Sequence, residues 1–94
     1  MKQIKIFSRT GRFAEDKDAA RSIRLDDILP AIESGEEIIL DFEGIEGTTQ
    51  SFIHALISDV IRKKGTDVLD KIFFKNCNDT VKKIIDIVVD YMQA

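Results

Sequence analysis

The chain of 94 residues contains no tryptophan, one proline, one histidine and one cysteine. A single thiol, Cys77, excludes an intramolecular disulfide and a cysteine-rich zinc site, and it suits a reducing compartment. No apolar run approaches the roughly 18 residues of a transmembrane segment, and the first residues lack the pattern of a signal peptide. These absences lead us to expect a cytoplasmic protein that has no membrane partner.

Positive charge is also scarce, because the formal net charge is −3 and the sequence pI is ≈ 5.1. A nucleic-acid-binding domain normally carries a basic face, whereas the Lys and Arg residues here are spread thinly. Their densest cluster, residues 62–64, closes a predicted helix, where cations interact favourably with the helix dipole. We therefore expect no nucleic-acid partner.

The composition is that of an ordinary globular protein, with 44% hydrophobic and 33% charged residues, and the length fits one domain over residues 1–94. Three segments have the pattern of strands. Residues 2–7 alternate polar and apolar, 37–42 form an apolar run typical of a central strand covered on both faces, and 71–76 form a third apolar stretch. Residues 8–17 show no periodicity, which predicts a loop, and this loop could hide another short strand.

Helical spacing of apolar residues separates the second strand from the first. We expect a helical stretch that starts after an N-cap at Asp18 and stops at Gly35. Pro30 interrupts the pattern, so that it either kinks one helix or lies in the first turn of a second short helix capped by Asp26.

The clearest predicted helix covers residues 51–64 and ends at Gly65. Its apolar residues form one wide stripe, and Ser51, His54 and Ser58 lie off that stripe. These three polar side chains are therefore expected on an exposed side of the helix.

A last helix is predicted after an N-cap at Asn78. Ile87 and Val89 widen its apolar face beyond what a small sheet needs, which indicates either a well-buried helix or a partner or dimer surface. The resulting order, β-α-β-α-β-α, predicts a small α/β domain with a mainly parallel sheet, packed helices and right-handed crossovers.

Groups for acid–base or metal chemistry are few. His54 and Cys77 belong to different predicted elements, so the pattern indicates no catalytic residue and no cofactor. Asp41, Glu43 and Glu46 cluster at the end of a strand, where they would either bind magnesium or form a solvated turn. A turn in which Asp41 accepts backbone hydrogen bonds is the interpretation we prefer, and we predict no metal site.

The segment GTTQS, residues 47–51, opens the helix of residues 51–64 with hydroxyl side chains. It lacks the lysine of a nucleotide-binding loop. Either Thr48 or Thr49 caps the helix, or the exposed helix start contacts an anion or carries a phosphate, which the helix dipole would favour.

Several segments together resemble a known family. GRFAED (residues 11–16), IRLDDILPAI (23–32) and GEEIILDF (35–42) lead into LDFEGIEGTTQSFIHALISDVIR (40–62), and this combination resembles the STAS-like domains of unknown function. Those domains are similar to the STAS domains of anti-sigma-factor antagonists and of anion-transporter tails. The resemblance implies an α/β fold with helices packed on a small sheet, a bacterial regulatory role and no catalytic activity.

The antagonist domains also imply a partner and a switch. In them, a kinase-like ATPase phosphorylates a serine at the start of the corresponding helix, and the phosphate changes the choice of partner. On this chain the acceptor position is Gln50, and Phe52 stands where those domains have glycine. Ser51 matches the STAS-like family itself and is the first-ranked switch residue, with Thr48 and Thr49 as its neighbours.

We therefore predict a non-catalytic, regulatory module that binds a protein partner through residues 44–58. The predicted turn residues are Asp41, Gly44 and Gly47, and the predicted interaction or switch residues are Thr48, Thr49, Ser51, His54 and Ser58.

Three alternatives stay open. The protein could be a phosphorylation-switched antagonist of a kinase-like ATPase. It could be a small enzyme or nucleotide-binding protein that uses the acids at the strand end with Arg9 or Arg12. It could also form a homodimer through the C-terminal helix.

Overall fold

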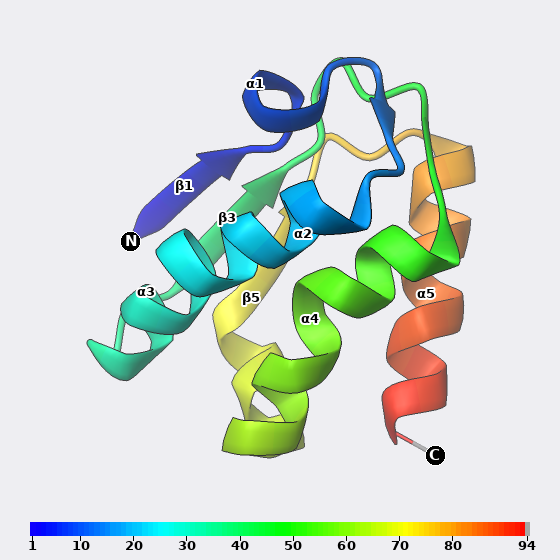
Figure 1. The fold of residues 1–94 in the computed structure, drawn as a ribbon. Coiled ribbons are helices and arrows are strands. Elements are labelled where there is room, and N and C mark those ends of the chain that lie inside the picture. Colours follow the sequence, from blue (N-terminus) through cyan, green and yellow to red (C-terminus); the bar gives the residue numbers. More distant parts are fainter. Residues whose placement is uncertain (94) are drawn as a thin grey trace.

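Three short parallel strands form the central sheet of the computed structural model, which describes residues 1–93 (Figure 1). The strands are β1 (Lys2–Lys5), β3 (Ile38–Asp41) and β5 (Ile72–Lys75), in the spatial order β1-β3-β5. Both pairs share one register, so that Lys5, Asp41 and Lys75 lie side by side across the sheet. The predicted parallel sheet, with the strand of residues 37–42 at its centre, is confirmed.

Helical segments connect these strands. They are α1 (Phe7–Thr10), α2 (Lys17–Ile23), the π-helical η1 (Arg24–Ile28), α3 (Leu29–Glu33), α4 (Gln50–Lys64), the 3-10 helix η2 (Thr66–Lys71) and α5 (Asp79–Gln93). The larger elements follow each other as β1, α2–α3, β3, α4, β5 and α5. This order confirms the predicted β-α-β-α-β-α domain of the α/β class.

The first long helical segment begins two residues earlier than predicted. Its N-cap is Asp16, whose carboxylate accepts a hydrogen bond of 2.9 Å from the backbone N–H of Asp18. The prediction of an N-cap at Asp18 is therefore wrong, because Asp18 already lies in the first turn as the residue that the cap satisfies.

Pro30 lies in the first turn of α3, as one of the two predicted alternatives required, but Asp26 does not cap that helix. The chain instead runs from α2 through η1 into α3 without a break, and the Leu29 N–H donates to the carbonyl of Arg24, five residues back. A π-helical turn is wider than an α-helical turn. We attribute it to Pro30, which supplies no N–H of its own and crowds the preceding turn.

A second, two-stranded parallel sheet joins two segments that the sequence pattern left as loop and turn. It consists of β2 (Phe13–Ala14) and β4 (Gly47–Thr48), with Phe13 opposite Gly47 and Ala14 opposite Thr48. The short strand β2 confirms the alternative that the loop of residues 8–17 hides another strand, whereas the helical turn α1 in this segment was not predicted. Elements of two to four residues are too short to produce a recognisable period in the sequence.

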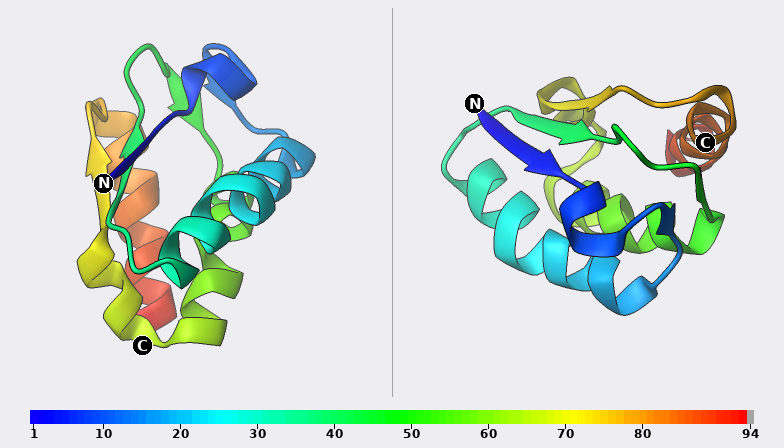
Figure 2. Two further views of the ribbon diagram at one scale, coloured as in Figure 1. Left: turned by 90° about the vertical axis from the view of Figure 1, so that its left-hand side faces the viewer. Right: turned by 90° about the horizontal axis from the view of Figure 1, so that it is seen from above.

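The helices α2, α3 and α4 lie along one face of the central sheet (Figure 2). On that face Leu40 is fully buried, whereas on the opposite face Ile39 is only half-buried and Lys5 and Phe73 are exposed. The prediction that the strand of residues 37–42 is covered on both faces is therefore wrong. Its apolar run reflects one buried face and one partly open face.

The helix α4 supplies much of the core, as its apolar stripe predicted. Five of its side chains are fully buried: Phe52, Ile53, Leu56, Ile57 and Val60. The expectation that Ser58 is exposed is wrong, since it is only 3% exposed. Beside it, the guanidinium of Arg24 donates to the Ala55 carbonyl (2.8 Å) and pairs with Asp59 (3.3 Å), so the segment α2–η1 closes over this side of α4.

The last helix, α5, packs against α4 and β4 at the edge of the molecule (Figure 1). Asn78 caps it as predicted, accepting a hydrogen bond of 2.8 Å from the Val81 N–H. Val81, Ile85 and Val88 are buried, as expected for its core face. None of the helices in residues 1–93 combines the length and apolar character that crossing a membrane requires.

Candidate functional site

The segment between β3 and α4 begins with a buried carboxylate. Asp41 is 5% exposed, and its side chain accepts hydrogen bonds from the Glu43 N–H (2.9 Å), from Nδ2 of Asn76 (2.9 Å) and from Nε2 of Gln3 (3.1 Å). These bonds connect the carboxyl end of β3 to Gln3 within β1 and to Asn76 just after β5. We call this group the strand-end network, and it confirms that Asp41 accepts a backbone hydrogen bond in the turn.

The same hydrogen bonds favour the ionised form of the Asp41 carboxylate. The hydrogen bond from Asn76, followed by the bond from the Glu43 N–H, lowers the pKa of Asp41 below its ordinary value, although burial acts in the opposite direction. Asn76 adopts a left-handed backbone conformation, with φ of 58°, which asparagine tolerates better than most residues. The network thus holds an ionised carboxylate for a structural purpose.

The two glycines of the turn support exposed aromatic rings. Gly44 has φ of +85°, and a Cβ atom there would lie 2.9 Å from Cδ2 of Phe7. A Cβ atom on Gly47 would lie 3.5 Å from Cδ1 of Phe13. Phe7 and Phe13 are 45% and 53% exposed, so the glycine at position 44 leaves room for a ring at the surface, whereas a Cβ atom at position 47 would make only ordinary contact with the other ring. Sequence reasoning identified the turn residues but not these contacts.

The two threonines that precede α4 serve the local structure. Thr48 donates its hydroxyl hydrogen to the Ala14 carbonyl (2.7 Å), which reinforces the pairing of β2 with β4. Thr49 is the N-cap of α4, and its Oγ1 accepts a hydrogen bond from the Phe52 N–H (3.0 Å). The prediction that one of the two caps the helix is confirmed for Thr49. Each of the two hydroxyl groups therefore makes one hydrogen bond within the protein.

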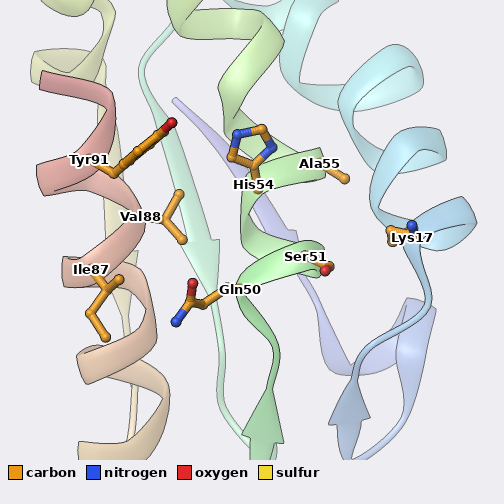
Figure 3. Close-up of a pocket in the computed structure, with 8 residues that line it drawn as sticks. All are labelled: Lys17, Gln50, Ser51, His54, Ala55, Ile87, Val88 and Tyr91. Atoms are coloured by element: carbon orange, nitrogen blue, oxygen red, sulfur yellow. The ribbon is translucent and has the colours of Figure 1, made fainter. Parts of the chain in front are cut away.

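Ser51 and His54, by contrast, line an open groove of ≈ 420 Å³. Its lining residues are Gln50, Ser51, His54 and Ala55 of α4, Ile87, Val88 and Tyr91 of α5, and Lys17 of α2. We call this hollow the α4–α5 groove. In Figure 3, Gln50 extends toward α5, whereas Ser51 and Ala55 point to the other side of α4, toward Lys17. The structure therefore brings two of the predicted site residues together with side chains that are distant in sequence.

The α5 side of the groove is apolar and unusually open. Tyr91 is 72% exposed and Ile87 is 44% exposed, and both lie opposite the start of α4 (Figure 3). Sequence reasoning noted Ile87 as an addition to the apolar face but missed Tyr91 and Lys17. An aromatic residue one helical turn after Ile87 was the available signal.

Cys77, the one other candidate for reactive chemistry, lies outside the α4–α5 groove. Cys77 lies in a different hollow, with Phe74 and Ile85, and burial raises the pKa of its thiol. Within residues 1–93, no group of three His, Cys, Asp or Glu side chains is placed to hold a metal ion. The structure thus leaves His54 and Cys77 in separate hollows.

The arginines proposed for nucleotide binding are both engaged. Arg9 pairs with the carboxylate of Asp27, and Arg12 pairs with Glu46 at 3.3 Å. Glu46 was one of the acids considered for magnesium, and its carboxylate instead faces this arginine. No contact in the described residues directs these groups toward a shared ligand site.

A family model described as "STAS-like domain of unknown function (DUF4325)" matches residues 20–82. The matched segment contains β3, the turn, α4 and β5, together with part of the first helical segment. The chain therefore belongs to this family of STAS-like domains. Comparisons with curated proteins and with solved structures gave no match.

Proposed function

We propose that this protein is a non-catalytic, cytoplasmic regulatory module that binds a protein partner in the α4–α5 groove. The observation that supports this most strongly is the exposure of Tyr91 and Ile87 beside the polar groups Ser51 and His54. Tyrosine is among the residues that contribute most to protein interfaces, and it does so where polar neighbours surround an apolar contact. An inserted apolar side chain of the partner would be enclosed by α4 and α5.

This surface is narrower than the one predicted from residues 44–58. Ser58 is buried, and the hydroxyls of Thr48 and Thr49 are used inside the protein. Ser51 and His54 are retained, and Gln50 and Tyr91 are added. The proposed surface therefore lies at the first turn of α4 and on the facing side of α5.

A photoreactive amino acid at position 50 tests this surface in the native host. We expect a crosslink to one partner protein, and we expect Tyr91→Ala in the same chain to remove it. The matched control carries the photoreactive group at Phe73, which is exposed on the open face of the sheet. Equal crosslinking from positions 50 and 73, or persistence after Tyr91→Ala, would contradict the proposed surface.

One observation favours a second proposal, in which a kinase-like ATPase phosphorylates Ser51. Among the three hydroxyls of residues 48–51, Thr48 and Thr49 make hydrogen bonds, whereas Ser51 is exposed and makes none within residues 1–93. Ser51 lies in the first turn of a 15-residue helix, where a phosphate is favoured by the helix dipole. The phosphate would then alter the groove directly.

Intact mass spectrometry of protein purified from its native host tests the switch. We expect a species heavier by one phosphate group that is absent from a Ser51→Ala variant. A phosphate found instead on Thr48 or Thr49, or none under any growth condition, would refute the switch at Ser51 while leaving the groove proposal standing.

A further inference from the structure

The outward side of α5 carries a set of mostly exposed residues. Successive residues of an α-helix are rotated by about 100°, so the side chains within about 60° of Ile87 share one side. We call this side the α5 outer face; within the described residues it consists of Thr80, Lys83, Ile84, Ile87, Asp90 and Tyr91. All of them are exposed except Ile84, which is half-buried and packs against the hydrophobic core at the border of this face.

The α5 outer face is self-complementary under a two-fold rotation. Suppose that a second α5 lies antiparallel to the first and that the two-fold axis passes beside Ile87. Two residues, one from each helix, then lie at about the same height along the helices when their numbers add up to about 174, because every residue adds the same rise. Lys83 then faces Asp90 of the other copy, and Asp90 faces its Lys83. A two-fold axis in the plane between the helices brings equivalent flanks together, so both ion pairs form on the same flank.

The other flank is apolar and pairs in the same reciprocal way. Ile84 of one copy faces Tyr91 of the other, and Tyr91 faces the other Ile84, while the two Ile87 side chains meet at the axis. Neither Lys83 nor Asp90 takes part in an ion pair within residues 1–93. Both charges are therefore free to serve a partner chain.

We propose that the α5 outer face is a self-association surface, on which a second copy of this chain docks with its α5 antiparallel and with reciprocal Lys83–Asp90 ion pairs. A parallel arrangement would instead place Lys83 beside Lys83 and Asp90 beside Asp90, which like charges disfavour. The apolar stripe supplies the attraction, and the charges select the direction of the helices.

Two helices of 15 residues form an interface at the small end of the range for specific complexes. We therefore expect a reversible dimer whose population rises with protein concentration. The surface does not depend on the function proposed above, but it shares Ile87 and Tyr91 with the α4–α5 groove. Self-association and binding of a groove partner would consequently exclude each other.

Charge reversals test the geometry of this dimer by sedimentation equilibrium over a wide concentration range. Each single variant, Lys83→Asp or Asp90→Lys, replaces two attractive pairs by two repulsive ones, so we expect a dimer Kd about tenfold weaker. The double variant Lys83→Asp/Asp90→Lys restores both pairs and should recover the wild-type Kd at the same salt concentration. Lys82→Asp and Asp86→Lys, on other sides of α5, are the matched controls and should have little effect.

A disulfide trap provides an independent measurement that does not depend on weak association. Helix axes 8–10 Å apart place residues at a two-fold axis roughly 4–5 Å apart between Cα atoms, which is within reach of a disulfide. In a Cys77→Ser background, Ile87→Cys should form a covalent dimer under mild oxidation, and Asp86→Cys should form far less. Circular dichroism of each variant verifies that it is folded.

Three results would overturn the proposal. They are a wild-type protein that is monomeric at every concentration, a double charge reversal that fails to recover the loss of the single variants, and equal covalent dimer from positions 86 and 87. The first result would contradict dimer formation, and the second would contradict the antiparallel register. The third would contradict the position of Ile87 at the two-fold axis.

Discussion

The strand-end network and the α4–α5 groove lie at opposite ends of the segment of residues 41–52, and they use polar residues in different ways. At the strand end, the buried Asp41 receives three hydrogen bonds from protein donors. In the groove, the exposed Ser51 makes no hydrogen bond within residues 1–93, and Tyr91 projects into solvent. The comparison shows that an acidic and hydroxyl-rich segment divides into a structural half, whose polar groups are bonded within the protein, and a half whose polar groups are exposed.

The largest expected effect on stability comes from removing the carboxylate of the strand-end network. Asp41→Ala leaves the donors of Asn76 and Gln3 and the N–H of Glu43 without their acceptor, so we expect a loss of about 2 kcal/mol in the free energy of unfolding. Urea denaturation measures it. Glu43→Ala, which removes an exposed neighbouring acid, is the control and should stay within about 0.5 kcal/mol of wild type. A loss as small for Asp41→Ala would show that the network is not structural.

A smaller effect on stability is expected to distinguish Thr49, in the structural half of the segment, from Ser51, in the exposed half. Thr49→Ala removes the N-cap of α4 and should cost about 1 kcal/mol, whereas Ser51→Ala should cost at most a few tenths because Ser51 is exposed. Paired thermal and urea unfolding of the two variants measures the difference. If Ser51→Ala destabilises as much as Thr49→Ala, Ser51 belongs to the structural half.

The pH dependence of stability gives a further, more gradual difference. The folded state lowers the pKa of Asp41, chiefly through the hydrogen bond from Asn76. Its stabilising contribution is therefore complete above the unfolded-state pKa and is lost as the pH falls through the lower, folded-state pKa. Wild-type stability should decline from about pH 4 downward more steeply than that of Asp41→Asn. Parallel curves for the two proteins would contradict the assigned cause.

The fold could be predicted where a long periodic pattern of apolar residues corresponds to one buried face of a helix or to one buried strand. The stripe of α4 and the central position of β3 are examples, since many buried side chains repeat the same signal. The pairing of β2 with β4 was not predictable, because two residues per strand carry no period and their contact spans more than thirty residues of sequence. The glycine and threonine of β4 indicated only a turn.

The sequence predicted where the candidate site lies, but it did not predict which residues line it. Ser51 and Ser58 are seven residues apart on the same side of α4, yet α2–η1 covers only the second of them, through Arg24 and its contacts with Ala55 and Asp59. No local sequence pattern indicates which part of a helix is covered by a segment that is distant in sequence. Tyr91 and Lys17 were missed for the same reason, because the packing of three helices places them in the groove.

The claim that the groove, and not the turn, recognises the partner is tested most directly by one variant that carries Ser51→Ala, His54→Ala and Tyr91→Ala. Its free energy of unfolding and its binding to the partner identified by crosslinking are measured on the same preparation. We predict a free energy of unfolding within about 0.5 kcal/mol of wild type and loss of partner binding. Undiminished binding by this folded variant would contradict the account.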